Sequence, residues 1–142
     1  MTSSVVRDRR AMIANMSPEL QEGSFVFCST ADRGRMLACA EKALGMFVEP
    51  EGHSFILATE EARALGFDTS MPMRQITLRV HSALDGVGLT AAVASELADA
   101  GIACNMVAAY CHDHVFVPQA EAVQALALLH DLQARHVGDG GA

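Results

Sequence analysis

The sequence predicts a small α+β protein, and three observations support this prediction. Residues 75–81 (QITLRVH) alternate apolar and polar side chains, which is the pattern of a strand with one buried face. Residues 89–100 repeat apolar side chains at helical spacing and stop before Gly101. Apolar residues make up 51% of the 142 positions, which is enough for the core of one compact domain or of two very small ones.

The second half of the chain predicts the order β-α-β-β-α. Its expected elements are a strand at 75–81, a loop at 82–88, a helix at 89–100, a strand at 102–110, a turn at 111–113, a strand at 114–117 and a helix at 119–135. The strand at 102–110 is apolar on both faces, so we expect it to be buried. The last helix should turn four residues inward: Val123, Leu126, Leu129 and Leu132. This order is that of a ferredoxin-like split β-α-β fold without its final strand.

The first half predicts a similar order from weaker signals. Its expected elements are a short helix from Ser17, a strand at 24–30, a weakly patterned segment at 31–42, strands at 43–49 and 54–58, and a helix from Thr59 to Gly66. We therefore expect a degenerate unit at 17–72, a better-defined unit at 73–135, and flexible termini at 1–16 and 136–142. The strand at 75–81 could serve both units, or each unit could lend a strand to the other.

Composition argues against several classes of protein. The net charge of −7 opposes nucleic-acid phosphates, whose neutralisation drives such binding, so we expect no nucleic-acid partner. No apolar run approaches the roughly 20 residues of a membrane span. The four cysteines form no CxxC pair, and we interpret them as reduced thiols of a cytoplasmic protein.

The predicted topology gathers polar groups at one end of the sheet. The first and second strands of the second half should run parallel, with the third antiparallel between them. Their shared end then brings together His81, the loop at 82–88, Tyr110 and the turn at 112–114. Backbone N–H groups at the start of the helix at 89–100 lack intrahelical partners, so a ligand carboxylate could bind there.

Two features of this end have alternative interpretations. Gly86 and Gly88 would let a ligand approach the backbone closely, or they simply shape the loop. Asn105 is a polar amide in an apolar strand and must find hydrogen bonds, either with a loop carbonyl or with a ligand.

Residues 76–117 resemble the ACT domain family. The matching features are a strand ending in His81, the sequence Val87-Gly88-Leu89-Thr90 at the start of a helix, a Gly101-Ile102 stop before the strand with Asn105, and His112-Asp113-His114 followed by Phe116-Val117-Pro118. The nearest resemblance is to small bacterial proteins with two ACT-like units in one chain, and it extends over residues 17–132. The first half shares the strand at 25–28 and the hairpin Glu49-x-Glu51-Gly52, but Val48 stands where that group usually has arginine.

The resemblance implies a regulatory protein rather than an enzyme. ACT domains bind amino acids or other small molecules, usually at an interface between two such domains. The resemblance therefore implies an amino acid or similar ligand, no cofactor and a homodimer. It implicates the following residues in binding: Asp85, Gly86, Val87, Gly88, Leu89, Thr90 and Asn105.

A metal-binding protein or metal-dependent enzyme is the alternative. His81, His112 and His114 would supply three imidazoles, and three with an open position would suit catalytic zinc. A tight turn at His112-Asp113 would instead splay these side chains. Cys111 beside either histidine is the one nucleophile–base pair in view.

Overall fold

This computed structural model describes residues 4–140 of the chain and the side chains of residues 4–137. The chain divides into two compact units. We call residues 22–74 the inserted unit, and the residues up to Gln21 together with those from Gln75 onward the composite unit. Among the described residues, no helix has the length and apolar character that crossing a membrane requires.

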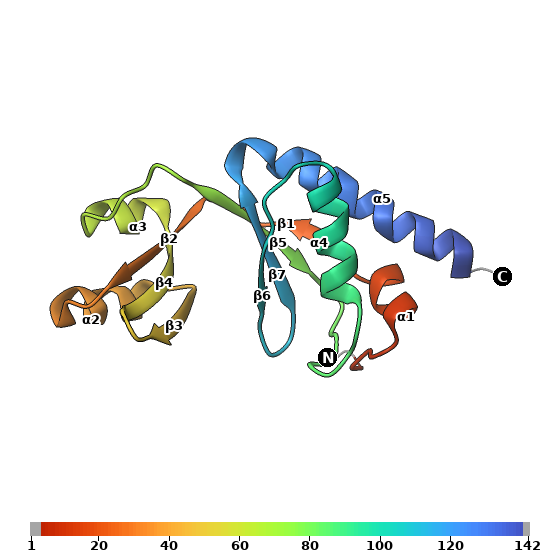
Figure 1. The fold of residues 1–142 in the computed structure, drawn as a ribbon, viewed down its shortest axis with the longest axis horizontal. Coiled ribbons are helices and arrows are strands. Elements are labelled where there is room, and N and C mark those ends of the chain that lie inside the picture. Colours follow the sequence, from red (N-terminus) through yellow and green to blue (C-terminus); the bar gives the residue numbers. More distant parts are fainter. Residues whose placement is uncertain (1–3, 141–142) are drawn as a thin grey trace. The chain divides into compact units, whose positions relative to one another are not determined.

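The composite unit contains one sheet with helices on one face (Figure 1). Its elements are α1 (Arg9–Ala14), β1 (Pro18–Leu20), β5 (Met73–Leu78), α4 (Leu89–Asp99), β6 (Asn105–Ala108), β7 (Asp113–Pro118), the 3-10 turn η1 (Gln119–Glu121) and α5 (Ala122–Gly140). The strands lie in the order β1-β5-β7-β6, so the third predicted strand lies between the first two, as expected. β1 is antiparallel to β5, and β6 is antiparallel to β7.

Alternation along β5 explains the core of this unit. Ile76 and Leu78 are fully buried, and Val80 continues the same face just beyond the strand. They pack with Val93 and Leu97 of α4 in one apolar cluster. Buried residues of α1, α5 and β7 complete that cluster: Met12, Ile13, Val115, Val117, Ala125 and Leu129. The three helices therefore cover the same face of the sheet.

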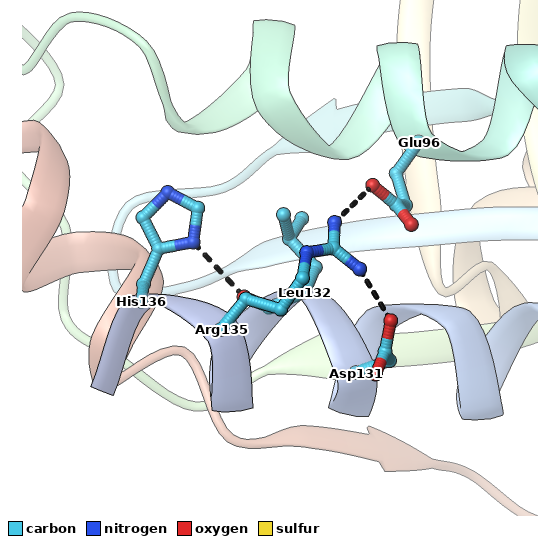
Figure 2. A network of polar contacts seen from close by, with 5 residues as sticks. All are labelled: Glu96, Asp131, Leu132, Arg135 and His136. Carbon is cyan, nitrogen blue, oxygen red and sulfur yellow. Dashed lines mark hydrogen bonds and ion pairs between the residues drawn. The ribbon is translucent and has the colours of Figure 1, made fainter. Parts of the chain in front are cut away.

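Ion pairs join the outer surfaces of α4 and α5 (Figure 2). The guanidinium of Arg135 donates a 2.7 Å hydrogen bond to Glu96 of α4 and another to Asp131, one turn earlier on α5. The Nδ1 atom of His136 lies 3.0 Å from the carbonyl oxygen of Leu132. Because Arg135 is exposed, the helices depend mainly on the apolar contacts beneath these pairs.

The N-terminal residues differ from the flexible segment expected at 1–16. Residues 9–14 form α1, and the side chain of Asp8 caps it by accepting a 2.9 Å hydrogen bond from the Ala11 N–H. Met12, Ile13 and Met16 recur at helical spacing and are at most 1% exposed. Burial of three large apolar side chains fixes the segment. Residues 1–3 and 141–142 lie outside the described residues, and α5 extends to Gly140.

The helix expected from Ser17 is wrong, because residues 18–20 form β1. β1 pairs with β5, with Pro18 opposite Leu78 and Leu20 opposite Ile76. Pairing across the sequence overrides the local helix-start signal of Ser17-Pro18-Glu19. β1 thus occupies the position of the final strand that the second half lacks, and it completes the four-stranded ferredoxin-like sheet.

The inserted unit repeats the arrangement on a smaller scale. Its elements are β2 (Phe25–Thr30), α2 (Arg33–Lys42), β3 (Gly45–Glu49), β4 (Gly52–Ala58) and α3 (Thr59–Ala64). The strands lie in the order β3-β4-β2, and Met73, which belongs to this unit, pairs with Phe25. The hairpin Glu49-x-Glu51-Gly52 that the resemblance implies is present, with Glu49 opposite Gly52. The core consists of Val26, Cys39, Phe55, Leu57 and Ala62.

Two local predictions fail for identifiable reasons. The strand expected at 102–110 is reduced to β6, which pairs with β7 alone and is half-exposed rather than buried. Val123 is 76% exposed, because a spacing of three residues rotates steadily around an α-helix of 3.6 residues per turn and places Val123 opposite the buried Leu132.

Candidate functional site

A hollow of about 230 Å³ opens at the end of β5 in the composite unit. It is lined by Val5, Arg7, His81, Ser82, Ala83, Leu84, Asp85 and Tyr110. These residues come from three places in the chain: the segment before α1, the loop between β5 and α4, and the turn after β6. The hollow therefore lies at the shared strand end where the sequence predicts polar groups to gather.

The N-terminal segment is hydrogen-bonded to the β5–α4 loop. The Val6 N–H donates to the His81 carbonyl at 2.8 Å, and the Ala83 N–H donates to the Val6 carbonyl at 2.8 Å. These bonds form a parallel bridge between Val6 and Ser82. Because side chains alternate along an extended segment, Val5 and Arg7 share the side opposite Val6, and both line the hollow.

Opposite charges meet at the edge of the hollow. The Nε atom of Arg7 donates a 2.9 Å hydrogen bond to Oδ1 of Asp85, and both side chains are mostly exposed. This hydrogen bond, with the charge of Arg7, lowers the pKa of Asp85. Asp85 therefore stays ionised at neutral pH, and the hollow presents a fixed cation beside a fixed anion.

Helix α1 lies against the two glycines expected to admit a ligand. Gly88 caps α4 with a φ of +112°, and a β-carbon there would lie 2.5 Å from Cδ of Arg9. A β-carbon on Gly86 would lie 3.0 Å from Sδ of Met12. In this structure the close approach at both glycines is therefore made by side chains of the same chain, and Gly88 is also required for its backbone conformation.

The remaining residues of the expected site are spread out. Val87 is 80% exposed and Thr90 is exposed, whereas Leu89 belongs to the core. Asn105 is exposed on β6, and its Nδ2 donates a 3.3 Å hydrogen bond to the carbonyl of Phe116 on β7. Of the residues expected to bind ligand, Asp85 alone lines the hollow.

The histidines divide between two environments. The rings of His81 and His112 meet edge to face with their centres 6.4 Å apart, and the Ser82 hydroxyl donates to Asp113 at 3.0 Å. His114 instead lies with its Nδ1 atom 3.0 Å from both the Thr77 hydroxyl and the Gln75 amide. Among the described residues, no group of three or more potential ligands is placed to hold a metal ion.

The hydrogen-bond donors around His114 favour the tautomer that carries its ring proton on Nε2. The Gln21 amide donates to the Thr77 hydroxyl at 3.1 Å, so the Thr77 hydroxyl proton is available for Nδ1 of His114. Nδ1 is then an acceptor and the ring proton is assigned to Nε2. Burial lowers the pKa of His114, and the neighbouring His112 lowers it further, while Asp113 acts in the opposite sense.

Burial disfavours the reactive thiolate form of three cysteines: Cys28, Cys39 and Cys104. Burial raises the pKa of Cys28 to about 11 and also raises that of Cys104. Cys111 is exposed in the turn after β6.

Two family models match the chain, and both are ACT domain models. One matches residues 5–74 and the other residues 70–131. The chain therefore belongs to the ACT domain family, with two ACT-like units, as the sequence resemblance predicted. Members of this family are regulatory, generally non-catalytic modules that bind small molecules.

Solved structures agree with this assignment. A protein of unknown function from Vibrio cholerae, described as a possible transport protein, has 40% sequence identity and a TM-score of 0.76; the match covers 87% of this chain and 94% of that one. The regulatory subunit of aspartate kinase from Thermus flavus shares the fold at 14% identity and a TM-score of 0.55, over 81% and 95% of the two chains. A protein from Agrobacterium tumefaciens also shares the fold, at 17% identity and a TM-score of 0.61. That match covers 82% of this chain and 87% of the other. A comparison with curated proteins finds no significant match.

Sequence reasoning missed the contribution of the N-terminal segment to the hollow. Val5 and Arg7 lie more than 70 residues from the loop that they meet. A signal was present in Asp8, which is a helix-capping residue, and in the apolar spacing of Met12, Ile13 and Met16. That pattern predicts a helix packed on a core and places the residues just before it against the same unit.

Proposed function

We propose that this protein is a non-catalytic regulatory sensor that binds an amino acid at the β5–α4 loop of its composite unit. The hollow beside that loop is the observation that supports the proposal. Its volume of about 230 Å³ is below the range of roughly 300–1,000 Å³ typical of sites for drug-sized molecules, so it suits a smaller ligand. The proposed site extends along the loop from Asp85 to Thr90, and Asn105 is a further proposed contact.

A thermal-shift screen with the twenty amino acids and common analogues tests this function. A ligand that binds only the folded protein raises its stability by mass action, by about 2.7 kcal/mol when its concentration is 100 times the dissociation constant. We expect one amino acid, or a chemically related group, to raise the melting temperature in a dose-dependent way. No shift with any of them at millimolar concentration would contradict the proposal.

We further propose that the protein acts as a cytoplasmic homodimer. Strand β6 ends the order of strands in the composite unit, so its outer backbone groups are available for pairing with a second chain. The four cysteines are free thiols, which is typical of a reducing compartment. Light scattering at micromolar concentration should give twice the 15.1 kDa chain mass, and a value of one chain mass would contradict the dimer.

A further inference from the structure

We propose that Arg7 and Asp85 together form the binding pair for a zwitterion, and that the apolar wall around them selects an amino acid with an apolar side chain. This inference rests on the proposed amino-acid site and adds its ligand class. It also assigns a binding role to the segment before α1. Arg7 would bind the carboxylate of the ligand, and Asp85 would bind its ammonium group.

Arg7 keeps the donors that a carboxylate needs. Its hydrogen bond to Asp85 uses Nε, and its two terminal nitrogens make no hydrogen bond within the described part of the chain. A guanidinium donates through a planar fork that matches the two oxygens of a carboxylate. The bond at Nε and the backbone bonds of Val6 hold Arg7 at the hollow without consuming these donors.

Asp85 keeps acceptor capacity for an ammonium group. An ionised carboxylate offers about four acceptor positions, and Arg7 occupies one of them at 2.9 Å. The cation of Arg7 and the anion of Asp85 thus lie side by side. An α-amino acid also carries neighbouring opposite charges, so its carboxylate can face Arg7 while its ammonium group faces Asp85. A ligand with one charge alone would bind only one member of the pair and would gain one charged contact instead of two.

Beyond this pair the wall of the hollow is mostly apolar, and His81 and Ser82 are its other polar residues. Val5, Leu84 and Tyr110 line it and are 52%, 70% and 79% exposed. Covering exposed apolar surface favours binding in proportion to its area. Arg7 is the one arginine and Asp85 the one carboxylate of the lining, and both are assigned to the backbone groups of the ligand. A charged ligand side chain would lose water without gaining a counter-charge, so apolar side chains are favoured.

Titration calorimetry with the whole chain tests the inference. The probes are L-valine, L-leucine and L-methionine, compared with L-aspartate, L-glutamine and L-lysine, and the variants are Arg7→Gln and Arg10→Gln. Arg10 lies on the neighbouring α1 and does not line the hollow, so its variant is the matched control for loss of one positive charge. We expect an apolar probe to bind most tightly. Arg7→Gln should weaken the binding of this probe by about 10- to 150-fold, the loss expected for a hydrogen bond to a charged group. Arg10→Gln should weaken its binding by less than about twofold. The N-acetyl and methyl-ester derivatives of the tightest apolar probe lack the ammonium charge and the carboxylate charge respectively. Each derivative should bind the wild-type protein at least about 10-fold more weakly than the free amino acid.

The possible failures are distinguishable. Tightest binding of a polar or charged probe overturns the inference and leaves the proposed function intact. Equal affinity of the wild type and Arg7→Gln for the tightest probe also overturns the inference and leaves the proposed function intact. Absence of binding by all six probes, with no response to the other amino acids in the thermal screen, overturns the inference and the proposed function together.

Discussion

Replacement of Ile13 by alanine tests whether α1 is an integral part of the composite unit. Ile13 is completely buried in the same cluster as Leu78, Val93 and Leu129. The substitution removes three carbon atoms, which corresponds to about 2.5 kcal/mol of lost transfer free energy at roughly 0.8 kcal/mol for each buried group. The cavity left behind adds to this, so we expect a total loss of about 3–4 kcal/mol.

Urea unfolding followed by circular dichroism measures this loss as a change in the free energy of unfolding. Arg10→Ala is the control, because Arg10 is exposed on the same helix and its truncation should change stability by less than about 0.5 kcal/mol. A loss below about 0.5 kcal/mol for Ile13→Ala would refute the packing of α1 and would return residues 1–16 to a flexible segment.

Three further predictions follow from the loop, the buried histidine and the edge strand. Gly88→Ala should destabilise the protein by about 1 kcal/mol or more, because its φ is +112°. Adding Arg9→Ala to this variant should restore only the part of the lost stability that comes from contact between the new β-carbon and the Arg9 side chain. Full restoration of the free energy of unfolding, measured in urea, would contradict a backbone requirement for glycine at this position. His114 has a lowered pKa in the folded state, so the unfolded state binds more protons as the pH falls below about 6.5 and stability decreases there. His114→Asn should flatten this part of the stability–pH profile, and an unchanged profile would assign the acid sensitivity elsewhere. Asn105→Ala should cost less than about 1 kcal/mol of stability, since it loses one exposed hydrogen bond; a larger loss, with amino-acid affinity intact, would make Asn105 structural and exclude it from the proposed site.

The parts of the fold predicted from the sequence are those specified by short-range patterns. Strand β5 follows from strict alternation, and α4 follows from helical spacing bounded by Gly101. Strand β1 could not be predicted in this way, because its three residues become a strand only by pairing with β5, far along the chain. Pro18 is equally compatible with the start of a helix and with a strand at the edge of a sheet.

The same distinction applies to the candidate site. The loop, Tyr110 and the histidine turn were expected at one end of the sheet because topology brings strand ends together. The pairing of Arg7 with Asp85 spans 78 residues and leaves no trace in local sequence. The glycines were expected to admit a ligand, but a sequence pattern cannot distinguish that from the approach of Arg9 and of Met12.

A heteronuclear NMR titration of the labelled whole chain with the amino acid that gives the largest thermal shift tests the central proposal most directly. The spectrum reports every backbone amide and the Arg7 Nε–H at once. We expect saturable shifts at the amides of residues 81–90 and at the Nε–H of Arg7, which line or adjoin the hollow. Shifts confined to residues 22–74, or no shifts at saturating ligand, would contradict amino-acid binding at this site.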